Sequence, residues 1–289
     1  MFSNDAITNT RESLRKVEVQ KESAKEKNVQ PVQLDSATLA ACAYHHERAM
    51  IYYNQKRYKD AITMFAELVQ YQYAPSLYYV GLCYLDGTGL TKNDQLAYKF
   101  ISNAAATGYT KAVYDQATML ENGIGTETDK NEAHMLFTKA ADLEEPRALV
   151  EMAHRYLEGR MVTQDKAMAE ELLRKGAAQK HPVAMYEYGK LLHESGRDGI
   201  AYIEAAAAVK NVDALLLLLE KETTAGNDKR AYRHARDLHL LGNHNGTKAM
   251  ADCYMHGRGV KRDKSLAKDL YREAAAAGNE DAKMIVEGW

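Results

Sequence analysis

Six alanines divide most of this chain of 289 residues at a fixed interval. Ala61, Ala97, Ala133 and Ala169 follow one another 36 residues apart, and Ala231 and Ala267 repeat the same step. A period of about 20 to 50 residues is typical of a solenoid, in which each repeat buries its core against its neighbours. Each repeat reads as a helix A, a loop and a helix B, so we expect an all-α, α/α superhelical solenoid.

The loops and helix ends carry their own repeated signals. Glycine favours positive φ at the end of a helix, and an acid just before a helix caps its N-terminus or sits in its first turn. The glycines expected at the end of helix A are Gly87, Gly123, Gly159 and Gly257. The acids expected at the start of helix B are Asp94, Asp129, Asp165 and Asp263.

Changes in pattern divide the chain into four parts. Residues 1–35 are rich in charge, and we interpret them as a mobile leader, with a docking segment as the alternative. Residues 36–73 resemble a tetratricopeptide helix pair. We expect six repeats over 74–279, the fourth and fifth irregular, and a capping helix over 280–289.

Composition excludes several classes of function. The net charge is −2, which gives no global attraction for nucleic acid or an anionic membrane. The sequence contains no run of about 18 apolar residues, so we expect no membrane-inserted helix. It also shows no signal peptide, so we expect a cytoplasmic protein. Cys42, Cys83 and Cys253 form an odd, sparse set, which indicates buried packing thiols rather than a disulfide scaffold.

The last complete repeat carries the motifs of a known family. These are Gly246, the run Tyr254-Met255-His256-Gly257-Arg258-Gly259-Val260-Lys261-Arg262-Asp263, Ala267, Tyr271, Ala274-Ala275 and Gly278-Asn279. This pattern resembles the Sel1-like repeat. Units beginning at Ala74 and Thr110 match it well, the unit at Pro146 moderately, and those at Pro182 and Asp213 poorly, so the resemblance covers residues 74–288.

The resemblance implies an α/α superhelix related to tetratricopeptide repeats. It also implies an adaptor or scaffold for protein complexes, most often in bacteria. Some secreted members carry a disulfide within each repeat, and this sequence lacks those cysteine pairs.

Four positions of helix A, at 18, 15, 14 and 11 residues before the anchor alanine, share one side of the helix. By analogy with related solenoids, this side lines a concave groove. Acidic residues outnumber basic ones there, so we predict a protein partner with a basic or mixed-charge segment. The alternative is an ordinary solvated helix face. The candidate residues are Tyr79, Asp115, Thr118, Asn122, Glu151, His154, Arg155, Glu158, Glu187, Lys190, Asp252 and His256.

The irregular middle of the chain is a second candidate. Five leucines, Leu215 to Leu219, are too many for one amphipathic face, which favours a helix covered on several sides over an exposed docking patch. A basic stretch follows, and it suits either an acidic partner or a charged outer helix B. Its candidate residues are Arg230, Arg233, His234 and Arg236.

No motif indicates catalysis, a metal or a cofactor. His45-His46-Glu47 lacks the His-Glu-x-x-His spacing, and no Gly-x-Ser-x-Gly elbow is present. We therefore interpret the chain as a noncatalytic protein–protein interaction module, an adaptor or scaffold. The first alternative is a dedicated inhibitor or immunity protein that binds one enzyme or toxin. The second is a hydrolase or small-ligand receptor that uses the irregular middle.

Overall fold

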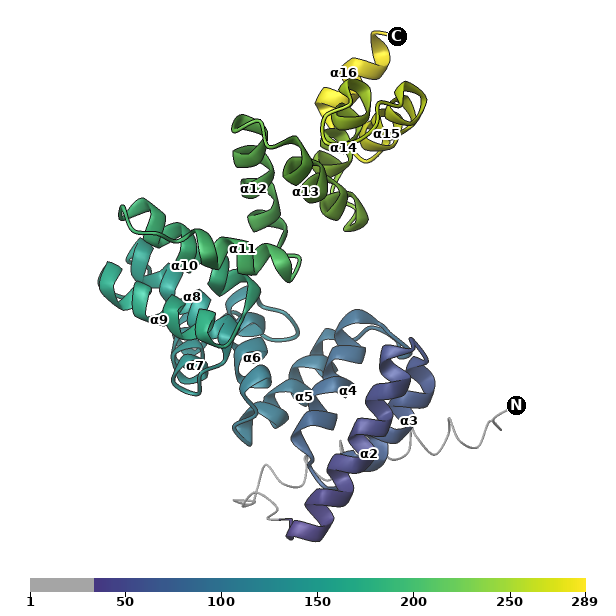
Figure 1. The fold of residues 1–289 in the computed structure, drawn as a ribbon. Helices are drawn as coiled ribbons and strands as arrows, with labels where there is room; N and C mark the ends of the chain where they lie inside the picture. Colours follow the sequence, from purple (N-terminus) through teal and green to yellow (C-terminus); the bar gives the residue numbers. More distant parts are fainter. Residues whose placement is uncertain (1–33) are drawn as a thin grey trace. The chain divides into compact units, whose positions relative to one another are not determined.

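The computed structural model describes residues 34–289, and within that range all regular secondary structure is helical (Figure 1). This confirms the all-α expectation. The leader proposed for 1–35 lies outside the described residues, except for residues 34 and 35. Asp35 caps the first described helix, where its side chain accepts a hydrogen bond from the amide of Thr38. None of the helices in the described range is long and apolar enough to cross a membrane.

The helices of the described range keep nearly constant lengths. They are α2 (Ser36–Asn54), α3 (Tyr58–Val69), α4 (Ala74–Asp86), α5 (Asp94–Ala106), α6 (Thr110–Asn122), α7 (Lys130–Asp142), α8 (Pro146–Glu158), α9 (Lys166–Ala178), α10 (Pro182–Glu194), α11 (Ile200–Ala208), α12 (Val212–Thr224), α13 (Asp228–Leu240), α14 (His244–His256), α15 (Lys264–Ala276) and α16 (Glu280–Glu287).

The chain forms two compact units, with the boundary between Met152 and Ala153, inside α8. Within the first unit the successive helices from α2 to α7 pack mainly against their sequential neighbours. The same pattern holds in the second unit from α9 to α16. Contact between sequential neighbours is the defining property of a solenoid, because each repeat completes the core of the one before it.

The anchor alanines lie at the tightest points of these cores. Five of the six have no exposed surface and Ala231 is 4% exposed. Small residues on helix A meet them from the neighbouring side, as at Gly81, where an added Cβ would lie 2.7 Å from a side-chain carbon of Ile101. Phe65, Phe100 and Phe137 fill the space between these close approaches. The 36-residue spacing therefore reflects a packing requirement.

The helix B start signals are confirmed. Asp129, Asp165 and Asp263 are N-caps, and each accepts hydrogen bonds from two backbone amides of the following turn. Asp94 is instead a first-turn acid, because Asn93 provides the cap. Each loop is also closed by a backbone bond, such as that from the amide of Asp129 to the carbonyl of Leu120 at 3.0 Å.

The glycines at the ends of helix A have the expected left-handed conformation. The φ angles at Gly87, Gly123, Gly159 and Gly257 are 71°, 68°, 71° and 73°. The second glycine of each pair has an additional constraint. A Cβ on Gly125 would lie 1.9 Å from the carbonyl oxygen of Asp94, so this loop packs directly on the preceding repeat. In the third repeat Met161 replaces that glycine and still has a φ of 62°.

Candidate functional site

The residues predicted on the helix A face differ widely in exposure. Exposed members are Asn122, Glu158, Lys190 and His256. Half-buried members are Tyr79, Asp115, Thr118, Glu151, His154, Glu187 and Asp252. The remaining member, Arg155, has 0% exposed surface. Helical periodicity placed Arg155 on the predicted face of helix A but could not show that this face is covered there. We therefore remove Arg155 from the candidate surface.

Tyr79 belongs to an aromatic cluster in the first unit. Its ring stacks on Phe65 with centroids 5.5 Å apart and meets the rings of Tyr53 and His46 at 5.2 and 5.6 Å. His46 also shares a 2.9 Å hydrogen bond with the buried hydroxyl of Ser76. Burial lowers the pKa of His46 to about 4, so the ring is neutral at physiological pH. Packing between helices accounts for these contacts of Tyr79.

Asp115 joins three successive A helices of the first unit. The hydroxyl of Tyr78 on α4 donates to Asp115 on α6 at 2.6 Å, and the guanidinium of Arg147 on α8 donates to it at 2.7 Å. Arg147 also donates to Glu145 at 3.0 Å and lies over the ring of Tyr114. Burial and then the Asp115 charge raise the pKa of Tyr78 well above its ordinary value. These interactions tie Asp115 to the stacking of repeats.

Asp252, at a different position of its repeat, also joins helices in the second unit, α14 and α15. It accepts a 2.5 Å hydrogen bond from the Tyr271 hydroxyl and pairs with Lys248 at 3.1 Å. Burial, followed by the bond to Asp252, raises the pKa of Tyr271. Asp115 and Asp252 therefore both hold helices together, and neither is a clean position for testing partner binding.

The five leucines lie on α12, and their exposure falls between the two interpretations. Leu215 and Leu218 are buried at 1% and 3% exposure, while Leu216, Leu217 and Leu219 are half-buried. The first two pack into the core of the second unit. The other three contribute apolar surface that neighbouring helices only partly cover.

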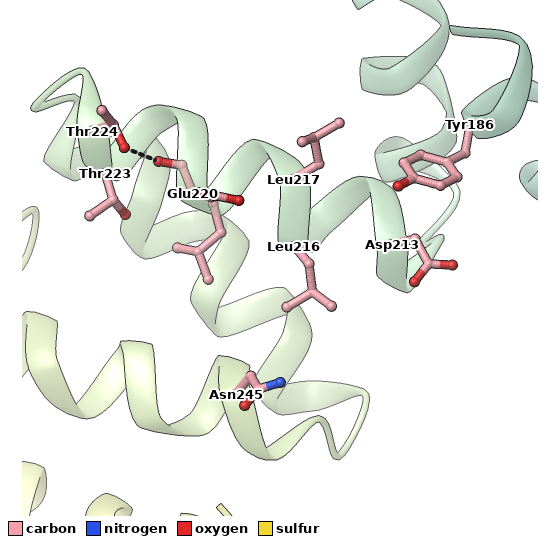
Figure 2. A pocket seen from close by; sticks show the side chains of 9 residues that line it. Tyr186, Asp213, Leu216, Leu217, Glu220, Thr223, Thr224 and Asn245 are labelled. Atoms are coloured by element: carbon pink, nitrogen blue, oxygen red, sulfur yellow. Dashed lines mark hydrogen bonds between the residues drawn. The ribbon is translucent and has the colours of Figure 1, made fainter. Parts of the chain in front are cut away.

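That partly covered surface forms the floor of an open groove of about 590 Å³ in the second unit (Figure 2). Its walls come from the A helices before and after α12 in the chain, with Tyr186 on α10 and Asn245 on α14. Figure 2 shows Leu216 projecting toward the helix that carries Asn245. The full lining is Tyr186, Asp213, Leu216, Leu217, Leu219, Glu220, Thr223, Thr224 and Asn245.

Four α12 residues of this groove occupy the same repeat positions as the residues predicted on the helix A face. Asp213, Leu216, Leu217 and Glu220 lie 18, 15, 14 and 11 residues before Ala231. They were not among the predicted binding residues, although the same offsets, applied to the fifth unit, would have found them. The shortened spacing before Ala231 and the leucine run obscured the pattern.

The charge in this groove is acidic. Asp213 and Glu220 are exposed, and no lysine, arginine or histidine lines the groove. The backbone carbonyl of Glu220 accepts a 2.9 Å hydrogen bond from the Thr224 hydroxyl, and no described hydrogen bond or ion pair involves its carboxylate. Burial is the main cause that raises the pKa of Tyr186. The nearby charge of Lys190 opposes this rise, and the charges of Glu187, Asp213 and Glu194 add to it.

A second groove of about 710 Å³ lies on the other side of α12. Leu217, Glu220 and Thr224 line both grooves, and the second one adds residues from the end of α10 and from α11. His193 and Asp198 lie along it. Asp198 accepts a 3.1 Å hydrogen bond from the amide of Ile200, the first residue of α11, and so stabilises the start of that helix. Within residues 34–289, no cluster of three or more potential metal ligands is present.

The basic stretch lies on α13 and is partly neutralised. Arg230 pairs with Glu222 at 3.2 Å, and Arg236 lies 3.8 Å from Asp237. His234 is half-buried, and burial lowers its pKa. Arg233 is exposed. These pairs agree with the interpretation of α13 as a charged outer helix B.

The repeat pattern of this chain matches the family model described as Sel1 repeat. The matched segments are 74–109, 110–144, 146–181, 182–207 and 245–279, which together cover more than half of the chain. The chain belongs to the Sel1 repeat family. Members of this family typically mediate protein–protein interactions. No matched segment covers 208–244, which contains α12 and α13.

One relative in sequence and two solved structures are similar to this chain. The uncharacterized protein NMB1327 of Neisseria meningitidis is 28% identical over 160 residues, 54% of this chain and 34% of that protein. The chain thus spans about a third of the length of this relative. A Sel1 repeat protein from Oxalobacter formigenes has a TM-score of 0.69 at 24% identity, covering 80% of this chain and 99% of its own.

A second similar structure is an immunity protein, PA5088, from Pseudomonas aeruginosa. It has a TM-score of 0.53 at 21% identity, over 71% of this chain and 81% of its own. At this level of identity the likeness concerns the fold alone.

Proposed function

We propose that this Sel1 repeat protein is a noncatalytic binding module that holds a protein partner on its helix A face. The observation that carries the proposal is the groove over α12, where three consecutive A helices contribute to one open, partly apolar surface. A solenoid presents such a surface on packed helices, so little ordering entropy is lost when a partner binds. The acidic lining favours a partner segment of basic or mixed charge.

Two kinds of binding module fit this proposal. An adaptor or scaffold, the first choice, holds several partners with modest affinity. A dedicated inhibitor or immunity protein holds one enzyme or toxin tightly, and the shared fold of PA5088 is the observation that keeps this choice in view. A hydrolase or small-ligand receptor would use the second groove, beside His193. A cytoplasmic location and a bacterial source remain predictions.

The test is affinity capture with the full chain from a lysate of its source cell, read by mass spectrometry. One variant reverses three acids on A helices of the second unit, Glu158→Lys, Glu187→Lys and Glu220→Lys. The matched control reverses three exposed acids on B helices, Glu67→Lys, Asp142→Lys and Glu204→Lys. Both variants have the same net charge, and circular dichroism checks that both remain helical.

Each outcome separates the alternatives. A partner lost from the A-face variant and kept by the control supports the proposed surface. One stoichiometric protein indicates a dedicated inhibitor, and several substoichiometric proteins indicate a scaffold. Equal capture by both variants removes the helix A face from the proposal, and absence of any specific protein with the unaltered chain overturns the binding module itself.

A further inference from the structure

We propose that the groove over α12 binds an amphipathic helix of a partner protein, with leucine-like side chains on one face and lysine or arginine beside them. This inference deepens the proposed function and rests on it. It assigns the groove to a ligand of stated secondary structure and charge. Three properties of the groove lead to it.

The first property is the apolar floor. Leu216, Leu217 and Leu219 are half-buried on α12 and all three line the groove, with Leu216 projecting toward the helix that carries Asn245 and Leu217 toward the opposite side of α12 (Figure 2). Covering apolar surface is favourable by roughly 25 cal/mol per Å². A volume of about 590 Å³ accommodates several side chains of a partner rather than a single anchor.

The second property is that the groove has only helical walls. Tyr186, Asn245 and the leucines all come from helices whose backbone groups are already paired within the helix. An extended peptide placed there would find no free backbone groups to pair with and only a few polar side chains, and each amide or carbonyl that it buried unpaired would cost about 1–3 kcal/mol. A helical peptide satisfies its own backbone and presents apolar side chains at i, i+3, i+4 and i+7.

The third property is the charge at the rim. Asp213 and Glu220 lie seven residues apart on the same side of α12, one before and one after the three half-buried leucines. In the described part of the chain neither carboxylate takes part in an ion pair. Both are exposed, so a lysine or arginine of the partner can reach them without being fully desolvated. Thr223, Thr224 and Asn245 add neutral hydrogen-bonding groups at the edge.

The experiment is a selection from a displayed library of random 18-residue peptides, with the full chain as the immobilised target. Enriched peptides are synthesised, their helicity is measured on binding, and their Kd values are determined by fluorescence anisotropy. We expect apolar residues at helical spacing with flanking lysine or arginine. We also expect strong dependence on salt, because the rim contacts are exposed.

Two pairs of variants assign the binding to this groove. Glu220→Lys is compared with Glu204→Lys, an identical charge change on the exposed part of α11 outside the groove lining. Leu216→Ala is compared with Leu240→Ala, which truncates a leucine that is 74% exposed on α13. We expect the groove variant of each pair to raise the Kd by about tenfold or more, and its control by less than about twofold.

Repeating the selection on Glu220→Lys gives the sharpest readout. The inference holds if acidic or neutral peptides replace the basic ones. It is overturned if no peptide is enriched, if the enriched peptides are extended or acidic on the unaltered chain, or if controls and groove variants behave alike. Self-association that is lost in Leu216→Ala, measured by sedimentation, would assign the groove to a second copy instead. Capture of a partner from lysate can succeed in each of these cases, so the two proposals fail separately.

Discussion

The Tyr78 hydroxyl donates a hydrogen bond to the Asp115 carboxylate at 2.6 Å, across two successive A helices of the first unit. Tyr78 is 6% exposed. The same carboxylate also accepts a hydrogen bond from the guanidinium of Arg147. Loss of Asp115 would leave the buried Tyr78 hydroxyl without its acceptor and would remove one of the two carboxylates that pair with Arg147.

We therefore expect Asp115→Ala to lower the free energy of unfolding by about 2–3 kcal/mol and Tyr78→Phe by about 1 kcal/mol. Urea denaturation of both single variants and the double variant measures their coupling. The two losses should not add, because Tyr78→Phe removes one of the groups that Asp115 satisfies. Additive losses would show that the hydrogen bond contributes little.

The Gly125 loop gives a second prediction. A methyl group at this position would lie 1.9 Å from the Asp94 carbonyl oxygen, whereas one at Gly226 has no atom within 4 Å. The two glycines have nearly equal φ angles, 69° and 71°. Both alanine variants share the conformational cost of about 1–2 kcal/mol, and Gly125→Ala adds a backbone clash.

We expect Gly125→Ala to lose at least about 2 kcal/mol more than Gly226→Ala. Urea denaturation compares the two, and thermal melting gives an independent ranking. Equal losses would mean that the loop moves away from the preceding repeat at no cost.

His46 predicts a pH dependence of stability. Burial among Phe65, Tyr73 and Tyr79 lowers its pKa from 6.5 to about 4. As the pH falls below 6.5, the unfolded chain binds this proton first, so stability declines between about pH 6.5 and 4 and the contribution is constant below that.

Because His46 is only partly buried, we expect a loss of on the order of 1–2 kcal/mol between pH 7 and pH 5. His46→Gln lacks the titration and serves as the reference, which cancels the effect of carboxylates. Parallel pH profiles for the two proteins would contradict the assignment.

The buried thiols give a fourth prediction. Burial raises the pKa of Cys83 and of Cys253 to about 11, and it also raises that of Cys42. Because the thiolate is the reactive form, the folded protein should react slowly with a disulfide reagent at pH 8. Three thiols should react promptly in denaturant. Rapid labelling of the native protein would instead indicate local opening around these residues.

The repeat period predicted the features that depend on close packing and on local backbone conformation. Ala97 and Ala133 are buried, Asp129 and Asp165 cap helices, and Gly123 has positive φ, because each of these features is fixed by a local backbone or volume constraint. Such constraints recur in every repeat and so appear directly as spacing.

The contacts of long side chains could not be predicted in the same way. Helical period placed Asp115 on the A face, but only the structure shows that Tyr78 and Arg147 reach it from neighbouring repeats. Arg155 is covered and lies 3.8 Å from the Met161 sulfur, which belongs to the following loop. Which loop covers which helix depends on the path of the backbone, and periodicity carries no information about that path.

The leucine helix α12 lies outside every segment that matches the family, yet it contributes most of the groove lining. Its outward leucines and acids are not the alanines and glycines that set the distance between helices. We therefore expect substitutions at Leu216 or Glu220 to alter the proposed binding while the stacking positions stay intact. In this chain the residues that mark the family and the residues proposed to choose a ligand are different, so the proposed binding surface is free to change without any change in the framework.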